Sequence, residues 1–222
     1  MGLTMVVVLH GMFLAYLPPG VPVSSRGDCV YRCCYQKDCS SLFYDGSTNL
    51  CQLSTEVYLE RDLTNTPTNM QYLVWRRDDC GTGYTWYRSL GLCYKIYTSR
   101  KTWFQVNTTC HQDGGYPIKV DSADINALVN KISDSYSAAR IWLGGFQVEK
   151  LSGIWTWPDG SVINPAFWDE TRHQPDQGES DQCILVVTGS GTSRRWHDAT
   201  CTWADLMFVC QRPLKEELYC WQ

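Results

Sequence analysis

Side chains that carry oxygen gather in one stretch of the chain, from Gln174 to Asp198. Gln174 and Asp176 flank a proline, Asp181 follows, and Asp198 comes after an apolar segment. Calcium is a hard cation that takes about six to eight oxygen ligands from carboxylates, amides and backbone carbonyls, so the stretch is a candidate calcium site. If the bond before the proline is cis, it turns both flanking side chains toward one point. The plainer alternative is a polar surface loop beside a core residue, Trp196.

At these positions the sequence resembles the C-type lectin domain. That family has a Gln-Pro-Asp triplet in a long loop region, then an acidic residue just before a cysteine, then a Trp-Asn-Asp triplet. The matching triplets here are Gln174-Pro175-Asp176 and Trp196-His197-Asp198. The resemblance implies a single calcium ion that a sugar ligates directly through two hydroxyls. It nominates as metal ligands Gln174, Asp176, Asp181 and Asp198, and as carbohydrate-binding residues the same four together with His197.

Two positions depart from the family pattern. Asp181 is one methylene shorter than the usual Glu, and His197 stands where the family has Asn. Imidazole nitrogen suits transition metals better than calcium, so weaker calcium binding than in a full site is predicted. Gln177 falls at a position of the family's second calcium site, and that second site is not expected. The remaining acids of the stretch are expected to be solvated surface groups: Asp169, Glu170 and Glu179.

Composition limits the classes of function. The chain has 222 residues, enough for one large or two small domains. A net charge of −4 and a pI near 5.5 give no electrostatic footprint for nucleic acid or anionic membranes. Twelve cysteines indicate an oxidising compartment, and no Cys-x2-Cys or Cys/His pair at zinc-ligand spacing occurs. Without a phosphate loop, an HExxH motif or a nucleophile beside a base, the chain is not expected to be an enzyme.

The chain opens with an apolar run from Leu3 to Leu17, and small residues follow at Ser24 and Ser25. This run is too short for a comfortable membrane span and is typical of a secretory signal peptide. Residues 1–25 are therefore predicted to be a leader, and the mature protein to be secreted and extracellular without a membrane span. The sequon at Asn107 predicts N-glycosylation on that route.

Residues 26–77 are predicted to form a small first unit. Asp28 is the expected N-cap of a short helix, and turn residues separate strand-like segments after it. The expected elements are a helix over 29–36 and strands around 42–44, 50–53 and 70–75. A short charged junction at 76–79 follows, so the two units are expected to be joined without a long linker.

The cysteines of this first unit resemble those of the PAN/apple module. Cys29 and Cys33 share one helical face, and Cys51 begins a Cys-x-Leu motif. Cys39 is followed by Phe43 and Tyr44, where the aromatic is shifted by one position from the module's Cys-x2-Phe-x-Tyr pattern. The resemblance, which covers the central part of the module, implies the bonds Cys29–Cys51 and Cys33–Cys39. The alternative is a small disulfide-stapled α+β unit with no ligand of its own.

Residues 80–211 form the second predicted unit, and the C-type lectin resemblance covers all of it. Trp103, Val106 and Cys110 follow the spacing of one helical face, and Ser122 is the expected cap of a second helix. Trp142-Leu143-Gly144-Gly145 and Trp155-Thr156-Trp157 match a core strand and a hairpin of the family. The implied fold is α+β, with two helices, antiparallel sheets and a long loop region. The implied disulfides are Cys80–Cys93, Cys110–Cys210 and Cys183–Cys201.

Two cysteines are left over, Cys34 and Cys220, the second of them in a tail over 212–222. They either bond to each other or join separate chains into a disulfide-linked dimer. Since the two units lack a long linker, the internal bond is favoured.

These patterns predict a secreted, calcium-dependent lectin of the galactose type that binds a carbohydrate or glycoprotein. The order of Gln174 and Asp176 is the reverse of the family's mannose-type Glu-Pro-Asn triplet, which implies galactose-like 3- and 4-hydroxyls. The alternative is a calcium-independent module of the same fold that binds a protein ligand. The fold is common to both and does not separate them.

Overall fold

The chain folds into two compact units. The computed structural model describes residues 3–13, 19–65, 69–164, 166–178, 181–187, 195–204 and 206–214. One unit spans Met1–Cys93, and Leu214 packs against its core. The other spans Tyr94–Arg212. Cys220 and most of the predicted C-terminal tail lie outside the described residues.

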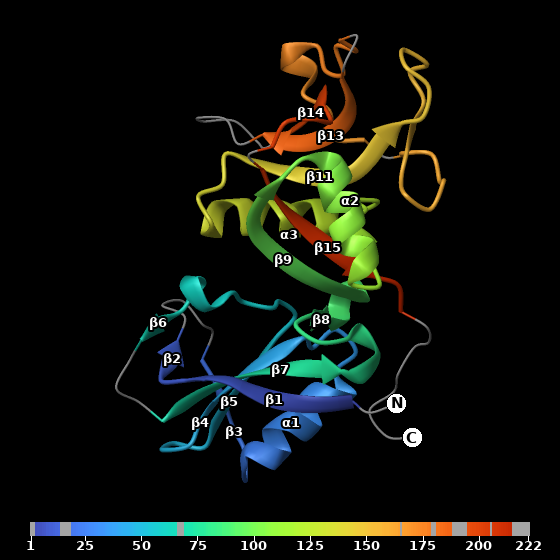
Figure 1. Ribbon diagram of the computed structural model, residues 1–222. Helices are drawn as coiled ribbons and strands as arrows, with labels where there is room; N and C mark the ends of the chain where they lie inside the picture. The colour runs from blue at the N-terminus through green and yellow to red at the C-terminus, as the bar shows by residue number, and fades with distance from the viewer. Residues whose placement is uncertain are drawn as a thin grey trace. The chain divides into compact units, whose positions relative to one another are not determined.

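The first unit is built on a five-stranded sheet with the strand order β1-β7-β4-β5-β3 (Figure 1). Helix α1 (Arg26–Tyr35) lies along one face of this sheet. Its N-cap is Ser25, whose side chain accepts a hydrogen bond from the backbone N–H of Asp28, the residue expected as the cap. The strands are β1 (Leu3–His10), β2 (Met12–Phe13), β3 (Val21–Pro22), β4 (Ser41–Asp45), β5 (Leu50–Ser54), β6 (Thr64–Asn65), β7 (Met70–Arg77) and β8 (Thr85–Tyr87).

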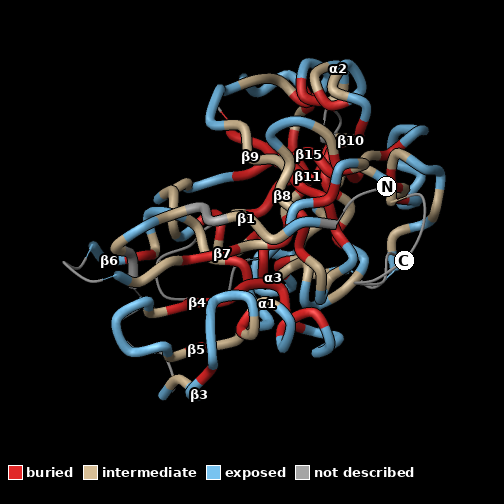
Figure 2. Tube along the Cα trace, turned by 90° about the horizontal axis from the view of Figure 1, so that it is seen from below, coloured by how far each residue is buried: buried red, intermediate tan, exposed pale blue. Residues whose placement is uncertain are grey.

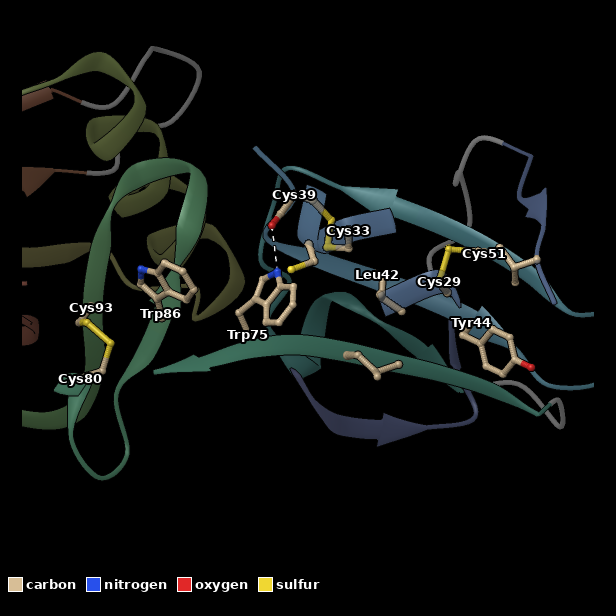
Figure 3. Packing of buried hydrophobic residues seen from close by; sticks show 13 residues of the cluster. Cys29, Cys33, Cys39, Leu42, Tyr44, Cys51, Trp75, Cys80, Trp86 and Cys93 are labelled. Atoms are coloured by element: carbon tan, nitrogen blue, oxygen red, sulfur yellow. Dashed lines mark hydrogen bonds between the residues drawn. A yellow bond between two sulfur atoms is a disulfide. The ribbon is translucent and has the colours of Figure 1, made fainter. Parts of the chain in front are cut away.

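Two disulfides fasten α1 within the first unit (Figure 3). Cys29–Cys51 ties the helix to β5, and Cys33–Cys39 closes the turn that follows the helix. These are the pairs that the PAN/apple resemblance implies. Trp75 packs beside them and donates its indole N–H to the carbonyl of Cys39 at 3.1 Å. A core of this size is small, so covalent links of this kind contribute much of its stability.

The run assigned to a leader forms the strand β1 in this structure. It pairs antiparallel with β7, from Leu3 opposite Arg77 to His10 opposite Gln71. A valine- and leucine-rich run has the apolar character of a signal peptide and also the residue preferences of a strand. Composition therefore does not separate the two outcomes, and cleavage near residue 25 stays a prediction.

The hairpin from Cys80 to Cys93, expected in the second unit, packs in the first. The two cysteines form a disulfide, and Trp86 between them belongs to the same buried cluster as Trp75 (Figure 3). Burial of this ring with the first core places the division between the units after Cys93. The predicted boundary was the charged junction at 76–79.

The second unit is organised around a sheet with the strand order β14-β13-β11-β15-β9, and β9 begins at Leu92. Most neighbouring strands whose register is described are antiparallel, but β11 and β15 pair in parallel. The strands are β9 (Leu92–Lys101), β10 (Tyr116–Pro117), β11 (Arg140–Gln147), β12 (Trp155–Thr156), β13 (Asp181–Val187), β14 (Arg195–Thr200) and β15 (Leu206–Arg212).

Two helices pack on this sheet, as the sequence predicted: α2 (Trp103–Gln112) and α3 (Ala123–Ser135). Thr102 and Ser122 cap them through their side chains. The buried residues of α2 are Trp103, Val106 and Cys110, and the last of these bonds to Cys210 on β15. Buried residues line the strands of this core (Figure 2). Within the described residues, no helix has the length and apolar character needed to cross a membrane.

The two ends of the second unit meet beside the end of α2. Lys95, near the start of β9, lies 2.7 Å from the carboxylate of Asp113. Arg212, at the end of β15, donates from Nε to the carbonyl of Gly114 at 3.2 Å. The hydrogen bond from Lys95 is the largest cause that holds the pKa of Asp113 below its usual value. The entry and exit of the unit are thus fixed to one turn.

Gly144 on β11 has no room for a side chain, and we expect Gly144→Ala to lower the free energy of unfolding by about 1–3 kcal/mol. A Cβ at this position would lie 2.6 Å from the carbonyl oxygen of Pro117, which is backbone and has no free rotation. Guanidinium unfolding followed by tryptophan fluorescence measures the change. The matched control is Gly27→Ala in α1, where a Cβ meets only the Ser25 hydroxyl at 3.5 Å. Equal effects at the two glycines would contradict this account.

Candidate functional site

The loop that precedes β13 is tied by its backbone to the start of β14. Trp196 donates its N–H to the carbonyl of Phe167 at 2.8 Å and accepts the N–H of Asp169 at 3.1 Å. Gln174 in turn donates its N–H to the carbonyl of Asp169 at 3.0 Å. Trp196 is fully buried, and its indole N–H donates to Asn126 of α3 at 3.1 Å. The loop is therefore held by a core residue. The prediction that Trp196 is a core residue is confirmed.

Three of the nominated residues form one hydrogen-bond network around the Gln174–Pro175 bond, which is cis. The side-chain oxygen of Gln174 accepts the backbone N–H of Asp198 at 3.0 Å, and its NH2 donates to the carboxylate of Asp176 at 3.1 Å. The carboxylate of Asp198 accepts two backbone N–H groups, from Asp176 at 3.1 Å and from Gln177 at 2.8 Å. Residues distant in the sequence are thus brought together.

Asp198 is the electrostatic centre of this network. The residue is 7% exposed, and burial raises the pKa of its carboxyl group above the usual value. The negative charge of Asp176 raises that pKa further, while the N–H donors of Gln177 and Asp176 oppose the rise. A buried carboxylate beside a second carboxylate is a place where a bound cation removes an unfavourable charge.

The described part of Asp181 is its backbone alone. It lies at the first position of β13, opposite Thr200 of β14, and its side chain lies outside the described residues, as do Glu179 and Ser180. Cys183 and Cys201 form a disulfide that joins β13 to the end of β14. The strand pair that carries both Asp181 and Asp198 is therefore covalently closed, as the C-type lectin resemblance implies.

His197 does not join the network of Gln174, Asp176 and Asp198. Successive residues of a strand point to opposite faces, and the His197 ring nitrogen Nε2 lies 3.1 Å from the carboxylate of Asp169. Asp169 is 8% exposed and also accepts the Thr171 hydroxyl at 2.5 Å. The expectation that Asp169 is a solvated acid is wrong. The bond from Thr171, followed by that from His197, holds the pKa of this carboxyl group below its usual value.

The sequence carries one signal for this pair. Asp169 directly follows Trp168, and His197 directly follows Trp196. Trp168 and Trp196 form a parallel β-bridge, which brings Asp169 alongside His197. A half-buried histidine in place of a metal-ligating amide needs a hydrogen-bond partner of its own. The acid one residue beyond a core tryptophan, Asp169, is that partner.

The donor set suits a hard cation by its chemistry. Gln174, Asp176 and Asp198 offer oxygen atoms alone, and a carboxylate has about four lone-pair positions, so the two N–H bonds to Asp198 leave room for an ion. Within the described ranges, no group of three or more His, Cys, Asp and Glu side chains could hold a metal. Gln174 is not among those residue types, and the Asp181 side chain lies outside the described ranges. The oxygen atoms of these three residues suit a calcium ion, but they supply only part of the about six to eight oxygen ligands that calcium takes.

An apolar loop borders the network. The turn between β11 and β12 approaches Gln177, because a Cβ built on Gly153 would lie 3.9 Å from the Gln177 amide nitrogen. Large aliphatic side chains of this turn and of the segment after β12 are exposed to between 58% and 70%: Val148, Leu151, Ile154 and Val162. Exposed aliphatic side chains mark a partner-binding surface where they form one contiguous patch.

A family model and curated relatives point to the same protein family. A family model described as the Lectin C-type domain matches residues 99–212. The C-type lectin lectoxin-Lio3 of Erythrolamprus poecilogyrus is 31% identical over 137 residues, which are 60% of this chain and 81% of that relative.

Solved structures with this fold include proteins of opposite calcium behaviour. A Ca2+-dependent type II antifreeze protein in its Ca2+-free form is 26% identical, with a TM-score of 0.51 over 60% of this chain and all of the other. A calcium-independent type II antifreeze protein is 24% identical, with a TM-score of 0.50 over 60% of this chain and 93% of the other, and this likeness shows the fold alone. The fold is therefore compatible with either behaviour.

Proposed function

The chain belongs to the C-type lectin domain family, and from this we propose that it is a secreted, calcium-dependent carbohydrate-binding protein of the galactose type. The observation that carries the proposal is the convergence of Gln174, Asp176 and Asp198 in one network. The buried carboxyl group of Asp198, with its raised pKa, supports a cation at this point. The proposed role of the chain is binding, without catalysis.

Each residue of the proposed site has a distinct task. Bound calcium would present coordination positions to two neighbouring hydroxyls of the sugar. Asp176, Asp181 and Asp198 would contribute carboxylate oxygens, and Gln174 its amide oxygen. The Gln174 NH2 is also a donor to a sugar oxygen, whereas a carboxylate can only accept. His197, which points to the other face of β14 and bonds Asp169, would act indirectly by holding the segment that carries Asp169 against β14.

The second candidate function is calcium-independent binding of a protein ligand. The exposed aliphatic side chains between β11 and the loop favour it, because protein interfaces have apolar centres. The bond between His197 and Asp169 also favours it, since this residue replaces an amide ligand of the family pattern and is engaged away from the network. The two candidates differ in one measurable property, the binding of calcium.

Calcium titration by calorimetry, with and without galactose, tests the proposal. We expect the wild-type protein to bind calcium near the millimolar range, which corresponds to about −4 kcal/mol, and galactose to add heat. Asp176→Asn should weaken calcium binding by about tenfold or more, because a charged ligand is lost. The matched control is Glu170→Gln, which removes the same charge from an exposed neighbour. An absence of heat at millimolar calcium would leave the protein-binding function in its place.

The first unit is proposed to be a PAN/apple-like module that accompanies the lectin domain. The pairing of Cys29 with Cys51 and of Cys33 with Cys39 supports it. Cys34 is also disulfide-bonded. We take its partner to be Cys220 of the same chain, a residue outside the described ones, because the short junction between the units favours an internal link over a dimer.

A further inference from the structure

The outer face of α2 combines an exposed aromatic ring with a glycosylation sequon. Phe104 is 59% exposed, and Asn107 lies one helical turn further along. Residues three and four apart on a helix are surface neighbours, with Cβ atoms about 5–6 Å apart. Trp103, Val106 and Cys110 occupy the opposite, buried face. Phe104 and Asn107 are therefore neighbours on the helix surface, with Phe104 exposed and Asn107 half-buried at the edge of the buried face.

The Asn107 side chain is available for modification. It is partly exposed, and no hydrogen bond to the described residues engages its amide, although its backbone carbonyl contacts the His111 ring at 2.7 Å. Thr109, the third residue of the sequon, is bonded through its hydroxyl to the carbonyl of Gln105 at 2.7 Å. An attached sugar at this position has solvent on its outer side and the Phe104 ring beside it.

The Phe104 ring is oriented by a fixed neighbour. Its centroid lies 5.9 Å from that of Trp103, with an angle of 87° between the rings. Trp103 is buried, and its indole N–H donates to the carbonyl of Leu143 at 2.9 Å. Edge-to-face pairs of this kind are favourable. Single exposed apolar residues are common on protein surfaces, but this one is held in place one turn from a sugar acceptor.

We propose that Asn107 carries an N-glycan and that the C–H face of its first N-acetylglucosamine stacks on the Phe104 ring. In the attachment step, the Asn107 amide nitrogen attacks C1 of a lipid-linked oligosaccharide diphosphate. The N–C1 bond forms as the C1–O bond breaks, the lipid diphosphate leaves, and the amide loses one proton. Stacking then covers the exposed ring and ties the glycan to the helix.

This inference rests on the secretion proposed above and on nothing at the calcium site. The test uses the full chain secreted from eukaryotic cells, with peptide mapping by mass spectrometry expected to show an occupied Asn107. Four proteins form a double-mutant cycle: the wild type, Phe104→Leu, Asn107→Gln and the double variant. Leucine keeps the apolar area and removes the aromatic face, so the cycle isolates the contact between ring and sugar.

Phe104→Leu should lower the Tm of the glycosylated protein by about 2–4 °C more than it lowers the Tm of the Asn107→Gln protein. NMR gives a second readout, because the N-acetyl methyl signal of the first sugar should shift upfield over the ring and lose that shift in Phe104→Leu. An unoccupied Asn107 overturns the proposal, and so do equal Tm losses in both backgrounds or an unshifted methyl signal. Calcium binding, measured separately, is unaffected by any of these outcomes.

Discussion

Removal of the Cys110–Cys210 bond by a paired change of both residues to alanine is expected to lower the free energy of unfolding of the second unit by about 4–5 kcal/mol. The bond spans 100 residues between α2 and β15. In the chain-entropy model, a cross-link restricts the unfolded chain more strongly as the closed loop grows. Both cysteines are fully buried, so alanine adds no polar group to the core. Guanidinium unfolding without reductant measures the loss.

The control for this change is the Cys33–Cys39 bond, whose partners are 6 residues apart. The same relation gives a loss of about 2 kcal/mol when that pair is replaced by alanine. The predicted order of the two losses is the diagnostic result, because it comes from loop length alone. Equal losses, or a larger one for the short loop, would show that native packing around the sulfur atoms dominates.

The double exchange Gln174→Glu with Asp176→Asn is expected to move sugar preference from galactose-type toward mannose-type ligands. In the network, Gln174 supplies an NH2 donor and Asp176 supplies a carboxylate. The exchange reverses donor and acceptor, and hence which pair of hydroxyl orientations is satisfied. An unpaired buried polar group costs about 1–3 kcal/mol, or roughly a tenfold to hundredfold change in affinity.

A glycan array in calcium, repeated with a chelator, measures this change. The double exchange leaves the net charge unaltered, so general electrostatic attraction is the same in both proteins. Each single exchange alters the charge by one unit and separates the two contributions. Galactose-type binding that persists unchanged after the double exchange, or in chelator, would falsify the assignment of this loop as the sugar site.

The parts of the structure that were predictable are those with a local cause. The spacing of Trp103, Val106 and Cys110 predicted the buried face of α2, and the hydroxyl of Ser122 marked the start of α3. The proline after Gln174 allowed the cis bond that the structure contains. Each of these outcomes depends on neighbours in the sequence, which is why a pattern could reveal it.

The parts that were not predictable depend on contacts between distant residues. Trp86 belongs to the first unit because its ring is buried in the same core cluster as Trp75. The role of Leu3–His10 as a strand depended on the open edge of β7. Burial of Asp169 depended on His197, which lies 28 residues further along the chain. Composition gave no information about any of these partners.

Both ends of the second unit meet at one turn, which makes this unit suitable for insertion into another protein. Lys95 and Arg212 are both fastened to the turn at Asp113 and Gly114, so the segment between them leaves and returns to nearly the same place. Neighbouring termini are what domain insertion requires. We therefore expect that the segment from Tyr94 to Arg212 can be inserted into a surface loop of an unrelated host protein. The long loop of the inserted unit can then be randomised to select new binding surfaces. The Cys110–Cys210 disulfide would keep the inserted unit closed.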